Sequence, residues 1–353
     1  MQNLLSRLLI IVIAILPLIS PMGLEWFPLV SSISLKATWG IIGISILFVM
    51  RIFLNNKIVI KKSNLYYPIL GFIIWCFISL FWVKSTYSAI LMLAQFTSYG
   101  LVFFLVLNIY KNLKDTEVLL KTIIVSLMVV SIIGILQSYF IDNYFVQNFF
   151  VQAVGPSSTF GNKNIATHFV VMVLPVSIVF YLNSKNRNNL VLYALSILAG
   201  LWYLYLTQAR QAYLAIAVEA FILLLFILID FIRNRGKSFI STIVLKKIKI
   251  LPIVFIITSL LVVGAFKNNN FLNKIYTLDY KSSLNARLPA WKNSFVMIKD
   301  NPLIGVGVGQ WSEIYPLYYD KVEKDVIFNE KTRLRRLHND YLEMLANAGL
   351  IGY

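Results

Sequence analysis

Charge, cysteine and histidine are scarce in this chain of 353 residues. Charged side chains make up 13% of it, about half the roughly 25% of a typical soluble domain, which is too few to cover a soluble surface of this size. Cys76 is the one cysteine, so a disulfide framework is excluded. With only His168 and His338 beside it, a Cys/His metal cluster is excluded too. The sequence therefore predicts neither a metal site nor a cofactor.

Apolar residues are abundant instead, at 59% of the chain. A transmembrane helix needs about 20 mostly apolar residues, and the chain has nine such runs and the start of another near Tyr341. The predicted spans are 4–22, 33–54, 65–83, 88–110, 117–140, 165–183, 190–207, 212–232 and 250–266. We therefore expect an all-α integral membrane protein of about ten transmembrane helices. Residues 1–266 form its membrane domain, and 341–353 begin a further helix that is too short to complete a span, as in a truncated chain.

The net charge of +17 raises nucleic acid as a partner in a soluble protein. Here the basic residues lie mostly in short segments between apolar runs, which indicates positive-inside loops and contacts with anionic membrane lipids instead. Sixteen of the 32 lie in alternate segments beginning with the N-terminus; the opposite short segments hold Lys36, Lys84, Lys163 and Arg210. This bias predicts a cytoplasmic N-terminus, whose first apolar run is retained because no small-residue cleavage site follows it.

By alternation, the long charged segment 267–340 lies outside the cytoplasm. Within it, residues 284–299 place Leu288, Trp291, Phe295 and Ile298 at helical spacing, which predicts an amphipathic helix. That helix lies either in the outer membrane interface or against the rest of the loop. The following NPLIGVGVGQW lacks the spacing of a dinucleotide site and predicts a tight glycine-rich turn.

Three polar places stand out as candidates for chemistry. Arg210, in LYLTQARQAYLAI, sits at the outer end of a span, where a charge is either functional or a snorkelling anchor. His338 follows an arginine cluster that includes Arg336. A neutral imidazole can accept a hydroxyl proton near pH 7, and guanidiniums match phosphate geometry, although a lone loop histidine is more often an ordinary surface residue.

The third place is GPSSTFGNKNIATH, at residues 155–168. It is a polar loop that opens a span on the outer side. Lys163 and the helix N-terminus there can hold an anion, or the segment is only a capped entry loop. We expect His168 to be a core residue bonded to a neighbouring helix.

Four stretches in this order resemble the O-antigen ligase/polymerase superfamily of bacterial cell-surface glycan enzymes. They are TFGNKNIATHF, TQARQAYLA, ARLPAW with NPLIGVGVGQW, and HNDYLEMLANAGLIG. The resemblance covers residues 150–353 by motif and the remainder by hydropathy.

The resemblance implies a metal-independent, inverting glycosyltransferase of the bacterial cytoplasmic (inner) membrane that serves lipopolysaccharide or polysaccharide biosynthesis in the cell envelope. Its donor is a glycan on undecaprenyl diphosphate, and its acceptor is another glycan or a lipid-linked one. The family's loop histidine falls on His338, its helix-end arginine on Arg210, and the arginine of its loop helix on Arg287. Arg336 and Lys163 are further candidates for binding the diphosphate.

A transporter or flippase for lipid-linked sugars is the main alternative, because it shares the helices and the outer positive groups. It has no need of a histidine beside arginines on a large outer loop, and it often carries inverted repeats, of which none is evident here. A scaffold for a glycan-assembly complex is a third reading.

Overall fold

The computed structural model describes residues 2–19, 32–54, 60–110, 113–140, 156–233, 287–325, 334 and 336–353. Within these ranges every regular element is a helix, which confirms the all-α prediction. Six of the described helices are long and apolar enough to cross a membrane: α2 (Ser32–Leu54), α4 (Thr86–Ile109), α5 (Leu113–Tyr139), α7 (Lys163–Asn183), α8 (Arg187–Thr207) and α9 (Arg210–Arg233).

Two shorter apolar helices occupy the predicted spans 4–22 and 65–83. They are α1 (Gln2–Ile15), which continues into the 3-10 turn Leu16–Leu18, and α3 (Tyr66–Ile78), which continues into Ser79–Phe81. The predicted span 250–266 lies outside the described residues, so the total of about ten spans stays a prediction.

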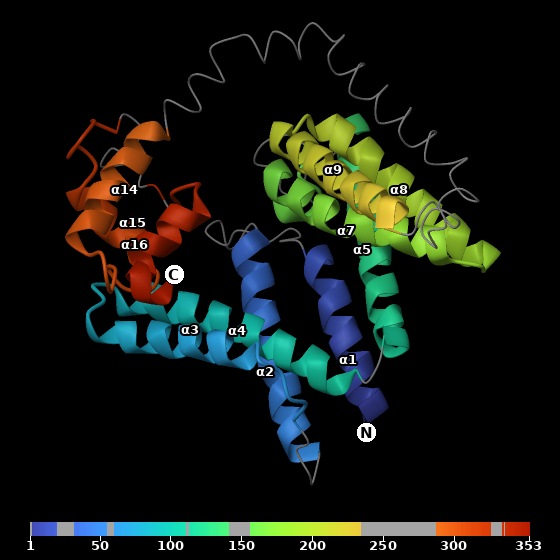
Figure 1. Ribbon diagram of the computed structural model, residues 1–353, viewed down its shortest axis with the longest axis horizontal. Helices are drawn as coiled ribbons and strands as arrows, with labels where there is room; N and C mark the ends of the chain where they lie inside the picture. Colours follow the sequence, from blue (N-terminus) through green and yellow to red (C-terminus); the bar gives the residue numbers. More distant parts are fainter. Residues whose placement is uncertain are drawn as a thin grey trace, which may run out of the picture. The chain divides into compact units, whose positions relative to one another are not determined.

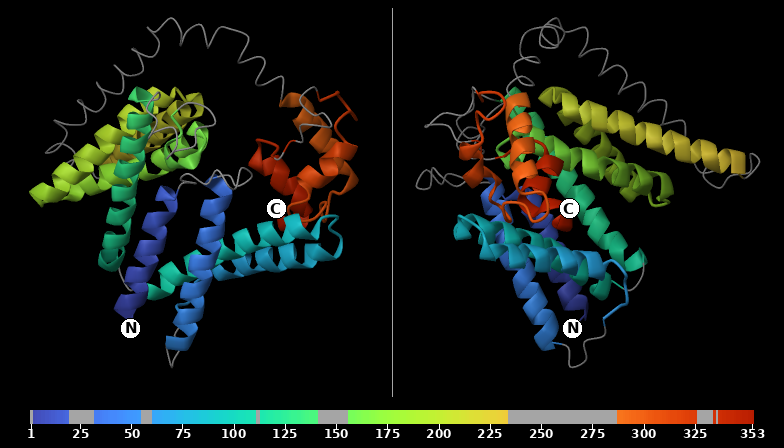
Figure 2. Two further views of the ribbon diagram at one scale, coloured as in Figure 1. Left: turned by 180° about the vertical axis from the view of Figure 1, so that it is seen from behind. Right: turned by 60° about the vertical axis from the view of Figure 1, so that its left-hand side comes forward.

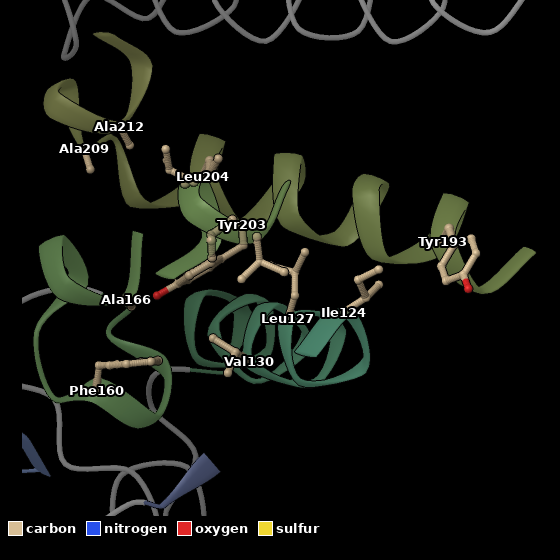
Figure 3. Packing of buried hydrophobic residues seen from close by; sticks show 13 residues of the cluster. Ile124, Leu127, Val130, Phe160, Ala166, Tyr193, Tyr203, Leu204, Ala209 and Ala212 are labelled. Atoms are coloured by element: carbon tan, nitrogen blue, oxygen red, sulfur yellow. The ribbon is translucent and has the colours of Figure 1, made fainter. Parts of the chain in front are cut away.

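The chain divides into two compact units, Met1–Gly43 with Tyr110–Phe271 and Ile44–Ile109 with Leu272–Tyr353. In unit 1, α5, α7 and α8 pack against one another, and α9 packs on α7 (Figures 1 and 2). Buried side chains from these helices form one apolar cluster (Figure 3). Gly134 lets the helices approach closely, because a Cβ there would lie 2.0 Å from the ring of Tyr203. The polar loop before α7 is thereby held at one end of the packed helices.

In unit 2, α3 and α4 lie side by side in every view (Figures 1 and 2). The C-terminal part of the unit contains α14 (Leu288–Asp300), the short α15 (Trp311–Ile314) and α16 (Asp340–Gly352). The helix α16 contacts α14, α15 and α3. It is not continuous: Gly349 has φ 65° and ψ −174°, so the helical course breaks there, inside the segment predicted to begin a further span.

The predicted amphipathic helix exists as α14, and Trp291 and Ile298 of its predicted face pack on the apolar cluster of unit 2, but the most buried side chains are others. Ala290, Asn293, Ser294 and Met297 are buried, whereas Phe295 is 49% exposed. The polar side chains are satisfied inside: Asn293 Nδ2 donates to two carbonyls, and Trp311 Nε1 donates to Ser294 Oγ at 2.9 Å. Periodicity of apolar residues missed this face because buried polar groups with partners lie on it. Of the two expected settings, α14 has the one against the rest of the segment.

Candidate functional site

Arg210 is the first residue of α9, directly after a tight turn from α8. Gln208 ends α8 in the left-handed conformation at φ 49°, and Ala209 and Ala212, on either side of Arg210, are buried. The hydroxyl of Tyr213 donates to the carbonyl of Leu204 at 3.1 Å, across the turn. The TQARQAYLA stretch thus fixes the exposed Arg210 at a helix N-terminus, where the dipole adds positive potential.

The polar loop before α7 is anchored on several sides. Gln137 exchanges two hydrogen bonds with the backbone of Ser158, at 2.6 and 3.0 Å. The hydroxyl of Tyr203 donates to the carbonyl of Pro156 at 2.8 Å. Asn162 caps α7 by accepting from the backbone N–H of Asn164, so Lys163 is the first residue of that helix.

A further cation belongs to this loop and was missed by the sequence reasoning. Lys36 Nζ donates to the carbonyls of Leu16 and Pro17, at 3.2 and 2.7 Å, and lies 4.3 Å from the ring centroid of Phe160. The sequence held a sign of this, since Lys36 is one of only four basic residues in the short segments of the predicted outer side. What the sequence does not show is that it joins α1, α2 and the polar loop.

Lys163 and Arg210 lie at the same end of unit 1. Phe160 and Ala166, which flank Lys163, share the apolar cluster with Ala209 and Ala212, which flank Arg210 (Figure 3). This end therefore combines two helix N-termini with cationic side chains, an arrangement that favours an anion. His168, expected in the core, is instead exposed on the outside of α7, so that prediction was wrong.

In unit 2, His338 lies just before α16 and has a left-handed backbone, φ 57°. Its neighbour Arg287 is the N-cap residue of α14 and is held there by the bond from the N–H of Trp291 to its carbonyl at 3.0 Å. Partial burial of the imidazole and the charge of Arg287 lower the pKa of His338, while Glu343 and Asp340 act to raise it. The net shift is downward, so the imidazole is neutral at pH 7.

Arg336 lies in the same unit and pairs with a carboxylate. Its Nη1 is 3.1 Å from Oε1 of Glu343, while just over half of the Arg336 side chain stays exposed. The neighbouring Arg333 and Arg335 of the predicted cluster lie outside the described residues. In unit 2 the structure thus sets Arg287 within electrostatic reach of His338 and pairs Arg336 with Glu343, and in unit 1 it sets Lys163 and Arg210 at the same end of the packed helices.

The glycine-rich stretch packs on the last motif as a backbone clip. Val306 N donates to Ala346 O and Gly307 N to Asn347 O, both at 2.9 Å. Gly305 and Gly349 have φ 67° and 65°, and a Cβ on either would lie 2.4 Å or less from a carbonyl oxygen. This is the predicted tight turn, and it explains why two motifs distant in sequence need glycine.

An apolar groove of about 710 Å³ lies between α3, α4 and residues 351–353. Its lining includes Trp75, Phe96 and Tyr99, and none of the five predicted site residues. Across the described ranges, no three His, Cys, Asp or Glu side chains gather as a metal site would require.

Comparison with known families matches residues 194–353 to the family model described as O-antigen ligase. Neither the curated proteins nor the solved structures gave a match. The matched region includes three of the four motif stretches and the site candidates Arg210, Arg287, Arg336 and His338; Lys163 precedes it. Residues 194–353, a little under half of the chain, are thus similar to the O-antigen ligase family that the motif stretches resemble.

Proposed function

We propose that this protein is a glycosyltransferase that moves a glycan from undecaprenyl diphosphate to an acceptor hydroxyl on the outer face of the bacterial cytoplasmic membrane. The family match supports a transferase of the O-antigen ligase/polymerase kind. The observation that carries the chemistry is the pair formed by His338 and Arg287, in which a histidine that is neutral at pH 7 lies within electrostatic reach of a guanidinium.

In the proposed reaction, His338 accepts the proton of the acceptor hydroxyl as its oxygen attacks the anomeric carbon. The bond between that carbon and the diphosphate oxygen breaks, and its electron pair leaves with undecaprenyl diphosphate. Direct displacement inverts the anomeric centre and needs no covalent intermediate. A base of this kind typically contributes about 100- to 10,000-fold in rate.

The leaving diphosphate needs positive charge around it. Arg287 supplies a guanidinium at the N-terminus of α14, where the helix dipole adds to it. Arg336 offers the exposed part of its side chain. We assign Arg210 and Lys163 the same role, because each begins a helix at the cationic end of unit 1. In this proposal the cationic side chains replace a divalent metal ion.

Bond formation, rather than transport, is the function that the family match favours. The acceptor is a glycan hydroxyl, either on a growing polysaccharide or on a lipid-linked core. These two acceptors separate a polymerase from a ligase, and the experiment below includes both.

The test uses membranes that contain the full protein, an undecaprenyl-diphosphate glycan donor and each candidate acceptor. Glycan transfer is followed by gel. His338→Ala is expected to abolish transfer while donor binding persists, and Arg210→Ala is expected to reduce transfer strongly. His168→Ala, which changes the other histidine in the chain, is the matched control and should retain wild-type transfer.

Retained transfer in His338→Ala would reject the base assignment. If no acceptor is glycosylated while the lipid-linked donor still crosses the bilayer, the transferase proposal falls and transport replaces it.

A further inference from the structure

The backbone of His338 is held in a conformation that L-residues seldom adopt. Its φ of 57° lies in the left-handed region, which persists for a residue with a side chain only where the surroundings enforce it. Such positions gather at functional sites, so the contacts that enforce this one are informative.

Leu337, directly before His338, is anchored through both of its backbone polar groups. Its N–H donates to Oε2 of Glu343 at 2.9 Å, and its carbonyl accepts from Nε1 of Trp291 at 3.1 Å. Its side chain is buried in the apolar cluster of unit 2. The backbone on the N-terminal side of His338 is therefore fixed.

Asn339, directly after His338, is fixed as well. Its side chain accepts from the N–H of Leu342 at 3.2 Å and caps α16, and its carbonyl accepts from the N–H of Glu343 at 2.9 Å. Glu343 thus contacts the chain on both sides of His338, through its carboxylate before the histidine and its backbone after it.

The carboxylate of Glu343 is unusual because its residue is only 6% exposed. A buried charge is costly unless it is paired and hydrogen-bonded. Both conditions are met here: Oε2 accepts the Leu337 N–H, and Oε1 lies 3.1 Å from Arg336 Nη1. A side chain needed only for packing would not require a charge at this place.

We propose that Glu343 is a positioning residue for His338, with Arg336 as its counter-ion. The carboxylate of Glu343 holds the backbone of Leu337, and this keeps His338 in the left-handed backbone conformation that orients its imidazole. This rests on the proposed function, in which His338 is the base. The charged groups that face His338 are Arg287 from α14, Asp340 and Glu343 from α16, and Arg336 through its pair with Glu343.

The experiment compares Glu343→Ala, Glu343→Gln and the matched control Glu313→Gln in the full protein. Glu313 is another carboxylate of unit 2 and accepts from Ser88 Oγ at 3.0 Å. Glu343→Ala should lower kcat about tenfold to a hundredfold, less than loss of the base itself, with little change in KM for the donor. Glu343→Gln keeps an acceptor for Leu337 N–H and should recover most of kcat.

A second readout does not depend on transfer. Histidine labelling gives only two NMR signals, from His168 and His338, and His168→Gln identifies the latter. Because the charge of Glu343 raises the pKa of His338, Glu343→Gln should move the His338 titration to lower pH, whereas Glu313→Gln should not. Wild-type kcat in Glu343→Ala, or an unmoved titration in Glu343→Gln, would overturn the proposal. If wild type itself transfers nothing, the titration still tests the positioning role, while the proposed function fails.

The role of Arg336 is tested by Arg336→Gln alone and together with Glu343→Gln. If Arg336 is the counter-ion of Glu343, the double variant should match Glu343→Gln in kcat, because the two residues work as one unit. Donor KM reports the separate contact of Arg336 with the diphosphate. A kcat for the double variant well below that of Glu343→Gln would overturn the counter-ion assignment.

Discussion

The imidazole of His338 stands between charges of opposite sign. Partial burial and then the charge of Arg287 lower its pKa, and Glu343 and Asp340 act to raise it. Above a lowered pKa the imidazole is neutral and can accept a proton, so a base in this setting works at and below neutral pH. Removing each charged neighbour should therefore shift the pH dependence of transfer in a direction set by the sign of its charge.

Arg287→Gln should shift the acid limb of the kcat/KM profile to higher pH. Removing the positive charge lets the pKa of His338 rise toward its ordinary value, so less imidazole is neutral at about pH 6. Transfer rates measured from pH 5 to 8 check this. Lys292→Gln is the control, since Lys292 lies on the same helix and pairs with Glu323 at 2.7 Å. An acid limb that stays in place in Arg287→Gln would contradict the assigned electrostatics.

At the scale of elements, the break in α16 depends on glycine. Gly349 has φ 65° and its missing Cβ would lie 2.3 Å from the carbonyl oxygen of Leu303. The N–H groups of Leu350 and Ile351 then donate to Pro302 and Leu303, so the clip continues past the break. The α16 break and the glycine-rich stretch thus form one interlocked piece of unit 2.

Gly349→Ala should destabilise unit 2 by more than the roughly 1–2 kcal/mol that a left-handed L-residue costs, because the added methyl also meets backbone. Gly71→Ala is the control: nothing lies within 4 Å of a Cβ there, and Gly71 lies inside helix α3. In that setting alanine is neutral or stabilises by about 0.5–1 kcal/mol. Thermal unfolding in detergent compares the two, and equal effects would contradict the clip.

In unit 1, Lys36 connects separate segments as the glycine-rich stretch does in unit 2. It caps the carbonyls at the end of the Leu16–Leu18 turn and contacts Thr159 and Phe160 of the polar loop. Lys36→Met keeps the length but leaves those carbonyls without their cation, which should cost about 1.5–3 kcal/mol. The control is Lys84→Met, which changes an exposed lysine of unit 2. Thermal unfolding at matched detergent concentration checks this, and similar melting of both variants would refute it.

At the scale of the whole molecule, the six apolar helices of the described ranges indicate an integral membrane protein, and the basic residues predict its orientation. The four basic residues of one side's short segments include Lys84, Lys163 and Arg210, and the sixteen of the other side include Lys185. The proposed chemistry requires the first group to face outward, since the glycan acceptor is outside.

Orientation is tested with single cysteines in a Cys76→Ala background. Both positions are exposed, so a cysteine at either can react with a maleimide. Lys84→Cys, on the predicted outer side, should react with a membrane-impermeant maleimide in intact cells, and Lys185→Cys only after the membrane is permeabilised. Labelling of Lys185→Cys in intact cells would reverse the predicted topology and remove the proposed function from the outer face.

Local sequence was enough to predict the all-α fold and to single out the candidate residues, whose roles stay predictions. Apolar length alone predicts the spans, because a bilayer requires about 20 apolar residues whatever their partners, and six of the described helices are long and apolar enough. TQARQAYLA and HNDYLEMLANAGLIG likewise marked Arg210 and His338, since the turn and the cap that hold them are built from adjacent residues.

Tertiary structure alone decided the burial, the backbone conformation and the hydrogen-bond partners of those residues. The face that α14 buries, the left-handed His338, the carboxylate of Glu343 on Leu337 and the lysine that joins α1 to the polar loop all depend on segments far apart in the chain. The physical reason is that a buried polar group is stable only with a partner. Sequence periodicity compares each residue only with its neighbours in the chain. It therefore assigns buried polar groups to the surface, because their partners lie in another segment.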